Sequence, residues 1–198
     1  MLYSIYNNGK KYGYLGFDWK QIISEFGESM DTRFDVNEFP RSYKSLWKTP
    51  IRVSFDDCEG LNGSAIPDIA EHQGRLFLNT KAYDALYDLL KNDGEFLPVV
   101  YELGEGFMFN PLSLANSQSD LDLKLCVKNE WGDVENITFN EDNVKRFTIF
   151  KTEYDRYYSV YCQDCVKTAV EQSGLKGVIF TPDLGNYLGS PESTEGSN

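Results

Sequence analysis

The segment that most constrains the fold of this chain is RFTIFKTEYDRYYSVYCQDCVKTAVEQSGLKGVIF, residues 146–180. Its pattern predicts a strand, a loop, an amphipathic helix, a glycine stop and a second strand. The helix is expected to begin at Tyr161 or Cys162 and to end at Gln172. Gly174 then stops it, because glycine adopts positive φ at low cost. The segment specifies an architecture, but it supplies no nucleophile, general base or complete metal site.

Earlier parts of the chain predict two more helices and a hairpin. An alternating run, YSIYNNGKKYGYL, surrounds Asn8-Gly9, and both of these residues tolerate the positive φ of a hairpin turn. Residues 19–26 predict a short helix. Thr80 is a suitable N-cap for a helix that runs to Leu90, where apolar residues recur on one face.

The middle of the chain is rich in strand patterns. Residues 96–103 and 106–110 flank a glycine turn, and Pro98 indicates an edge strand or a bulge because proline cannot donate to a ladder. Residues 121–128 alternate, and residues 134–139 return after a Gly-Asp turn. These two runs predict a further hairpin.

The patterns together predict an α+β fold with a mainly antiparallel sheet and two principal helices packed on it. Residues 1–182 are expected to form a single α+β domain. Within it, residues 1–60 are rich in aromatic side chains and residues 66–181 form the core. Residues 183–198 are polar and rich in Gly and Ser, so a mobile tail is expected there.

The charge of the chain is strongly acidic. The formal net charge is −12, and residues 51–198 carry 25 acidic and 12 basic side chains. A field of that sign repels nucleic acid and anionic membranes and attracts a basic partner, although solubility alone also explains it. No apolar run reaches the roughly 18 residues of a membrane span, and the start lacks a secretion signal. A cytoplasmic location is therefore expected.

The cysteines allow one chemical alternative. Cys162 and Cys165 form a single CxxC, whereas Cys58 and Cys126 lack a matching spacing, so four zinc ligands are not indicated. A thioredoxin-like redox pair would need the CxxC at a strand-to-helix junction, and YYSVY can supply that strand. The favoured interpretation is that the thiols are free, with one of the pair packed inward and the other facing out.

Other candidate catalytic groups are few. His72 is the only histidine and no nucleophile motif accompanies it, so it is expected in a solvated turn. Acidic pairs are frequent but lack the spacing of an EF-hand. The sequence predicts neither a metal nor another cofactor.

The order of elements from residue 66 onward resembles that of a known family. The resemblance is carried by IPDIAEHQGRLFLNTKAYDALYDLL, EFLPVVYELGEGFMFNPL, RFTIF and CVKTAVEQSGLKGVIF, within residues 66–181. These segments are similar in order and spacing to the eleventh immunity-protein family of bacterial polymorphic-toxin systems, formerly a domain of unknown function. The first 60 residues match it only loosely.

The resemblance implies a protein that is not an enzyme and that binds a cognate toxin domain tightly, occluding its active site. An acidic surface suits a basic toxin such as a nuclease. The residues expected to contact the toxin are the acidic loop of Asp56, Asp57 and Glu59, with Asp120 and Asp122 as a second patch. The alternatives are a small redox enzyme that uses the CxxC, and an acidic adaptor that binds a basic protein unrelated to toxins.

Overall fold

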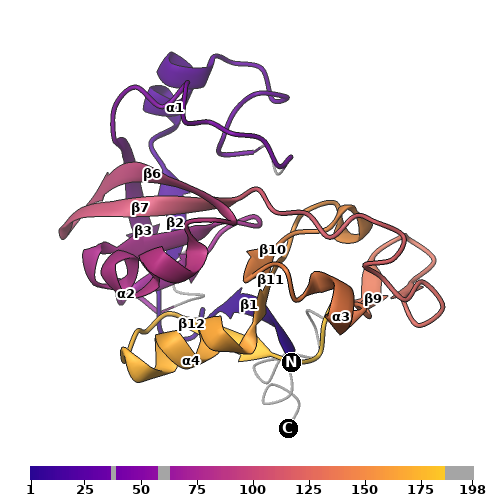
Figure 1. Ribbon diagram of the computed structural model, residues 1–198. Coiled ribbons are helices and arrows are strands. Elements are labelled where there is room, and N and C mark those ends of the chain that lie inside the picture. Colours follow the sequence, from indigo (N-terminus) through magenta and orange to yellow (C-terminus); the bar gives the residue numbers. More distant parts are fainter. Residues whose placement is uncertain (37–38, 58–62, 186–198) are drawn as a thin grey trace, which may run out of the picture.

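The structure, a computed structural model, describes residues 1–36, 39–57 and 63–185 (Figure 1). It has mixed α and β content with mainly antiparallel sheets, so the predicted fold class is confirmed. The strands form two principal sheets and a two-stranded hairpin. Within the described residues, no helix is both long enough and apolar enough to cross a membrane.

The elements have the following bounds. The helices are α1 (Trp19–Phe26), α2 (Thr80–Leu90), α3 (Glu141–Val144), the 3-10 turn η2 (Glu153–Asp155) and α4 (Asp164–Gln172). The strands are β1 (Leu2–Asn7), β2 (Tyr14–Phe17), β3 (Ile51–Asp56), β4 (Ile69–Glu71), β5 (Leu76–Asn79), β6 (Gly94–Tyr101), β7 (Gly104–Pro111), β8 (Val127–Lys128), β9 (Val134–Asn136), β10 (Ile149–Phe150), β11 (Val160–Gln163) and β12 (Val178–Thr181).

The four-stranded sheet joins the two ends of the described chain. Its order is β10-β11-β1-β12, and every pair is antiparallel. The predicted hairpin around Asn8-Gly9 is wrong. A turn does form, because Tyr12 N–H donates to Asn8 O, but β2 leaves for the other sheet and pairs with β3. β1 instead lies between β11 and β12, where it buries Tyr3 and Ile5.

The six-stranded sheet has the order β2-β3-β6-β7-β5-β4. Its only parallel pair is β3 with β6, which begins at Val99. β6 is therefore an interior strand, and the expectation that Pro98 marks an edge is wrong. Pro98 is tolerated because it lies just before that pairing, and its carbonyl accepts a hydrogen bond from Trp47 Nε1 at 2.7 Å.

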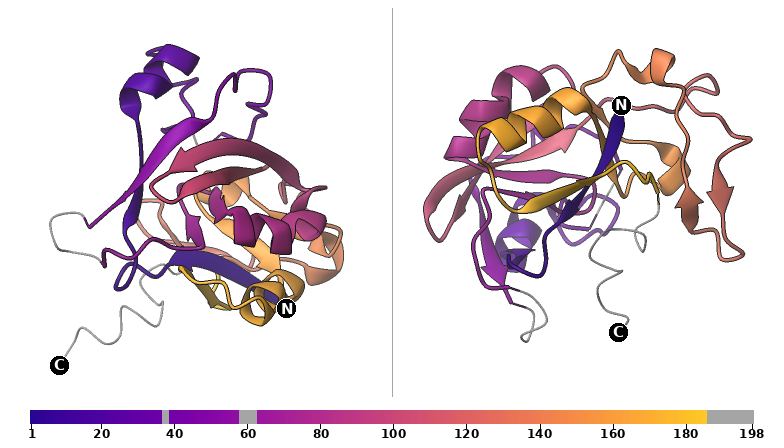
Figure 2. Two further views of the ribbon diagram at one scale, coloured as in Figure 1. Left: turned by 90° about the vertical axis from the view of Figure 1, so that its left-hand side faces the viewer. Right: turned by 90° about the horizontal axis from the view of Figure 1, so that it is seen from below.

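The two principal helices, α2 and α4, lie side by side (Figures 1 and 2). α2 packs on β5 and β7 of the six-stranded sheet, and α4 packs on β1 and β11 of the four-stranded sheet. α2 begins at Thr80 with Asn79 as its N-cap, one residue before the expected cap, because Asn79 Oδ1 accepts Ala82 N–H at 2.9 Å. α4 begins at Asp164, later than predicted, because Cys162 is still paired in β11 with β1 and β10.

Three clusters of buried side chains make up the core. The first lies between the sheets and the inner faces of α2 and α4. The second lies on the opposite face of the six-stranded sheet, where Phe77 and Met108 meet Phe34, Tyr43 and Trp47. The third lies behind the four-stranded sheet, under α3 and the β8–β9 hairpin. Neighbouring strand residues face different clusters, as the two-residue period of a strand requires.

Candidate partner-binding arm and adjoining cavity

A segment that we call the arm, residues 121–139, lies at the edge of the molecule away from α2 (Figures 1 and 2). A bridge between Leu121 and Phe139 closes its base, and β8 pairs with β9 near its end. The predicted hairpin is therefore confirmed. Only two residues of the expected strand 121–128 are regular strand, because Asp122 forms a turn instead. Its Oδ1 accepts Lys124 N–H and its backbone oxygen accepts Leu125 N–H.

The arm exposes large apolar side chains. Leu123 and Leu125 are each 55% exposed, Val127 is also exposed, and Trp131 is 76% exposed. We call these four residues the apolar patch. Their carboxylate neighbours, all exposed, are Asp122, Glu130, Asp133 and Glu135. Large apolar side chains that are exposed close together in the chain and flanked by carboxylates favour an interaction surface.

The tip of the arm is held by its own hydrogen bonds. Asn129 Oδ1 accepts the N–H groups of Trp131, at 3.0 Å, and Asp133, at 2.9 Å. Gly132 has φ of +85°, which lets the chain turn back at that point. The backbone of Trp131 is therefore fixed while its indole remains in solvent.

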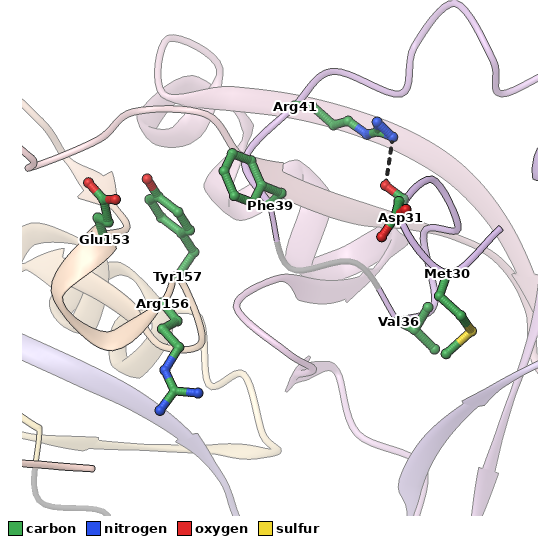
Figure 3. Close-up of a pocket in the computed structure, with 8 residues that line it drawn as sticks. All are labelled: Met30, Asp31, Val36, Phe39, Arg41, Glu153, Arg156 and Tyr157. Carbon is green, nitrogen blue, oxygen red and sulfur yellow. Dashed lines mark hydrogen bonds between the residues drawn. The ribbon is translucent and has the colours of Figure 1, made fainter. Parts of the chain in front are cut away.

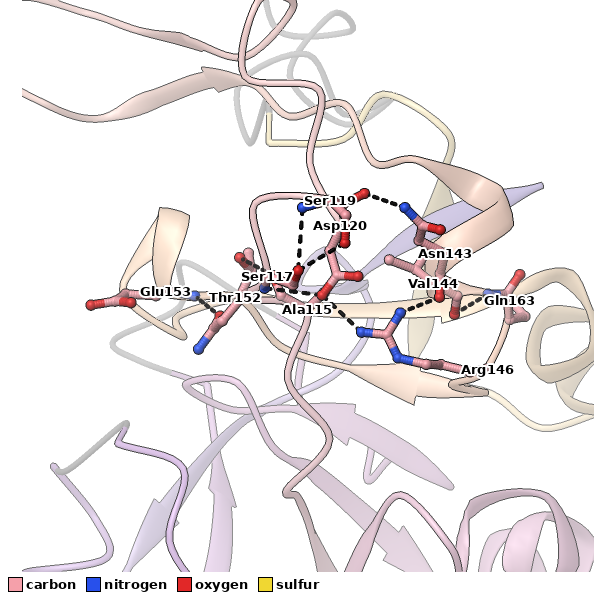
Figure 4. Close-up of polar contacts among 11 residues, drawn as sticks. Ala115, Ser117, Ser119, Asp120, Asn143, Val144, Arg146, Thr152, Glu153 and Gln163 are labelled. Atoms are coloured by element: carbon pink, nitrogen blue, oxygen red, sulfur yellow. Dashed lines mark hydrogen bonds and ion pairs between the residues drawn. The ribbon is translucent and has the colours of Figure 1, made fainter.

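An ion pair between the buried Asp120 and the partly exposed Arg146 anchors the base of the arm (Figure 4). Asp120 is 1% exposed, and its Oδ2 accepts hydrogen bonds from Arg146 Nη2 at 2.8 Å and Ser117 N–H at 3.0 Å. The same guanidinium also donates to Asn143 O. The hydrogen bond from Arg146 lowers the pKa of Asp120, with a smaller contribution from Ser117. Asp120 was predicted to contact a partner directly. It is instead buried, so its role is to hold the arm.

The other predicted contact residues lie in two places. Asp56 ends β3 and Asp57 follows it; both are exposed, while Glu59 lies outside the described residues. Asp122 is exposed on the arm. Asp56 belongs to the six-stranded sheet and Asp122 to the arm, so the two acidic patches come from separate elements of the fold (Figure 1).

A cavity of about 700 Å³ adjoins the arm. Its lining comes from six separate segments: the end of β1 with Gly9 just after it, Tyr14 at the start of β2, the β4–β5 turn, Gly132 to Val134 of the arm, the loop from Tyr154 to Ser159, and Gly185. Tyr6, Tyr14, Tyr154 and Tyr158 all contribute to its walls. Sequence spacing did not predict this grouping, because no two of these segments adjoin in the chain.

Glu71 is fixed at the wall of this cavity. Its backbone is clamped by Asn7, which accepts Glu71 N–H at 2.7 Å and donates to Glu71 O at 2.5 Å. Its Oε1 accepts Gly74 N–H at 2.7 Å. The residue as a whole is partly exposed, but its carboxyl group is enclosed by protein, and this desolvation raises the pKa of Glu71 to about 7. The Gly74 N–H and the Lys151 ammonium oppose the rise.

His72, next to Glu71, is not the solvated residue that the sequence suggested. Burial, with a smaller contribution from Arg75, lowers the pKa of His72 to about 4, so its ring is neutral at pH 7. The imidazole packs edge-on against Phe17, with ring centroids 5.3 Å apart. Its role in the described structure is therefore packing at the cavity wall.

Asp155 organises the facing loop. Its carboxylate accepts hydrogen bonds from Tyr161 OH at 2.9 Å and from the N–H groups of Tyr157 and Ser159, each at 3.1 Å. Burial raises the pKa of Asp155 in spite of these donors. This carboxylate is thus already committed to holding the loop.

The cavity walls also carry unusual backbone. Among the described non-glycine residues, only Gln73, Arg156 and Tyr157 have positive φ, at 48°, 60° and 65°. The two loops meet closely, since a Cβ at Gly74 would lie 2.4 Å from Tyr157 O. Such residues each store roughly 1–3 kcal/mol of strain and concentrate at functional sites.

A second hollow of about 640 Å³ lies beside the cavity (Figure 3). At its wall the ring centroids of Phe39 and Tyr157 are 5.3 Å apart, and Arg41 Nη2 donates a hydrogen bond to Asp31 O at 3.1 Å. Arg156 points away from Phe39 and also lines the larger cavity. This side chain therefore stands between the two depressions.

The CxxC motif spans the end of β11 and the start of α4. The expectation of one inward and one outward thiol is confirmed, since Cys162 is fully buried and Cys165 is exposed. Burial raises the pKa of Cys162 well above that of an ordinary thiol, the opposite of what a thiolate nucleophile needs. Cys126, Cys162 and Cys165 are free thiols, and Cys58 lies outside the described residues. In that described part, no three His, Cys, Asp or Glu residues are grouped to hold a metal ion.

No protein-family model matches the chain, and comparison with curated proteins finds no match. The features that bear on function are therefore the arm and the cavity. The sequence contained only a partial signal for the arm. The alternation LDLKLCVK predicts a strand, but only Val127 and Lys128 of this run are strand, and Leu123 to Leu125 form a turn.

Proposed function

We propose that this protein is a cytoplasmic immunity protein, without catalytic activity of its own, that neutralises a cognate bacterial toxin domain by binding it and occluding its active site. The observation that carries this proposal is the apolar patch on the arm. Burying it against a partner would remove four large apolar side chains from water. Trp131 has the character of an interaction hot spot, since it is a large aromatic group on a pre-formed turn.

Charge supports a basic partner. The four carboxylates around the apolar patch outnumber the two lysines of the arm, and one of these lysines, Lys128, is exposed with its Nζ 4.4 Å from the centre of the Tyr154 ring. The net charge of −12 comes from residues 51–198, which carry 25 acidic and 12 basic side chains, whereas residues 1–50 carry six acidic and seven basic ones. Such complementarity accelerates encounter with a cationic toxin and makes the association rate sensitive to salt.

The sequence resemblance adds to the proposal. The segments that carry it correspond to β5 and α2, the β6–β7 pair, β10, and α4 with β12. These segments build the shared core rather than the arm. A family of toxin-binding proteins is expected to keep such a core and to vary the surface that meets each toxin.

The thiol-redox alternative has less support. Its leading cysteine, Cys162, is buried in a strand and its pKa is raised, so at neutral pH it stays protonated. The adaptor alternative uses the same arm and the same charge. It differs only in what the partner does.

The test is co-expression with the product of the adjacent upstream gene, scored by growth and by co-elution in size exclusion. The wild type should rescue growth and form a stable complex. Trp131→Ala should weaken the complex by roughly 30-fold or more, which is about 2 kcal/mol. Trp19→Ala is the matched control, because Trp19 is also exposed but lies on α1. Equal loss in both variants, or rescue without a complex, would contradict the proposal.

Charge is tested separately. Asp122→Lys on the arm should slow association and leave dissociation nearly unchanged, since steering acts on encounter. Asp57→Lys reports on the acidic loop beyond β3 in the same assay. If only Asp57→Lys slows association, the contact surface lies at that loop and the arm assignment is wrong.

A further inference from the structure

We propose that the cavity beside the arm is a receptor for an organic cation, the guanidinium or ammonium group at the end of a partner's arginine or lysine side chain. This inference rests on the proposed function, because it assigns the cavity to the same partner that the arm binds. The cavity shares Gly132, Asp133 and Val134 with the arm. A chain docked on the apolar patch would therefore lie next to the cavity opening.

The cavity has the size and walls for such a group. Its volume of about 700 Å³ falls in the range of small-ligand sites. Four tyrosines line it, and aromatic rings attract cations through their electron-rich faces. One of these rings already holds a cation from within the chain, since Lys128 of the arm lies over Tyr154.

The charges at the wall favour a cation. Glu71, Asp133 and Asp155 line the cavity against one guanidinium, Arg156, which is exposed. Asp155 already accepts three hydrogen bonds from its own loop. Glu71 accepts one, from Gly74, out of the roughly four that a carboxylate can accept. Glu71 thus retains acceptor capacity at the cavity wall.

A buried acceptor points the same way. Gln73 lines the cavity, and its Oε1 is buried without a hydrogen-bond partner in the described structure. Buried polar groups are normally paired, so an unpaired carbonyl at a cavity wall indicates a missing donor. Guanidinium offers five N–H donors and ammonium three. Gln73 is also held in the positive-φ region, in a turn whose strain would serve to aim this acceptor.

Binding should be linked to protons. A cation in the cavity would favour the ionised form of Glu71, whose carboxyl is half-protonated near pH 7, so binding should release a proton at pH 6.5. The other charged groups that act on this carboxyl are Lys151, Arg75 and Asp155.

The test uses the full chain with Nα-acetyl-arginine methylamide as probe and its citrulline counterpart as the uncharged isostere, followed by amide NMR shifts. The expected result is saturable binding of the arginine probe at the cavity, at least tenfold tighter than the citrulline probe. The lysine analogue distinguishes guanidinium from ammonium recognition. No saturable shift, or equal binding of the citrulline probe, would overturn the inference.

Two variants test the assignment at positions where the substitution should leave the fold intact. Glu71→Gln preserves the acceptor for Gly74 and should weaken the arginine probe by about tenfold. Tyr158→Ala changes a rim side chain that is 55% exposed and should weaken it less. Tyr87→Ala, on the exposed side of α2, is the control and should bind the probe as the wild type does. Equal probe binding by Glu71→Gln and wild type would also overturn the inference.

Failure of this inference can be told apart from failure of the proposed function. Growth rescue with no probe binding leaves the immunity proposal standing and removes the cavity assignment. Probe binding without rescue or complex supports a cation site and removes the toxin as its source.

Discussion

Replacing Glu71 with glutamine should change how the stability of the protein depends on pH. In the folded chain the enclosed carboxyl has a pKa of about 7, whereas an unfolded glutamate titrates near 4.5. The folded state therefore holds a proton that the unfolded state has already lost between these two values. Stability must fall as pH rises through this window, because the unfolded state gains from ionisation first.

The size of the effect follows from the two pKa values. Between pH 5 and pH 8 the wild type should lose about 2 kcal/mol that the Glu71→Gln variant keeps, since each unit of pKa difference corresponds to about 1.4 kcal/mol. The glutamine Oε1 can still accept Gly74 N–H, so the turn between β4 and β5 should be preserved. The unfolding free energy of Glu71→Gln minus that of the wild type should therefore be larger at pH 8 than at pH 5.

Urea unfolding of both proteins at pH 5, 6, 7 and 8 measures this difference directly. Glu105→Gln, at an exposed position of β7, serves as the control and should run parallel to the wild type. Parallel curves for wild type and Glu71→Gln would refute the reasoning. So would a wild type that becomes more stable, relative to Glu71→Gln, as the pH rises.

Three further predictions concern the arm, a turn and the thiols. Asp120→Asn should lower the free energy of unfolding by about 1–3 kcal/mol, and hydrogen exchange should show loss of protection in the arm. Because folding lowers the pKa of Asp120, the difference in unfolding free energy between wild type and variant should vanish as the pH falls through that pKa. Gly177→Ala should lower the free energy of unfolding by roughly 3 kcal/mol or more, since the new Cβ would lie 2.1 Å from Ile69 O at a φ of +127°. Gly174→Ala, in open space at a φ of +60°, should lower it by about 1 kcal/mol, and thermal unfolding of both variants measures the difference. In a Cys58→Ser background, a thiol reagent should modify Cys165 in the native state and Cys162 only after unfolding; rapid native labelling of Cys162 would contradict its burial.

Local patterns predicted the elements better than their partners. Both ends of the helix at 19–26 and the end of the helix at Leu90 follow from sequence, because apolar spacing and stop signals lie within one or two turns. The pairing of β1 does not, because its neighbours β11 and β12 lie more than 150 residues away in the chain. The Asn8-Gly9 pair predicts a turn, but a turn alone does not decide whether the strands before and after it pair with each other.

The candidate site was predictable only in part. The charge pattern found Asp122 on the surface, but it placed Asp120 there too. Two residues of the same charge and the same local composition differ in burial because Arg146, 26 residues later, folds onto only one of them. The cavity has no local signature, since its wall is assembled from segments that are separate in sequence.

The position of β1 in the middle of its sheet also sets the timing of folding during synthesis. β1 is made first, yet both of its neighbours follow residue 159. At about 5–20 residues per second, roughly 10–30 s of translation separate Tyr3 from its cross-strand partner Cys162. Throughout that interval the inner side chains of β1 have no sheet to join. The first core cluster can close only when translation has passed β12, so the core of a newly made copy stays open until residues 160–181 have been added.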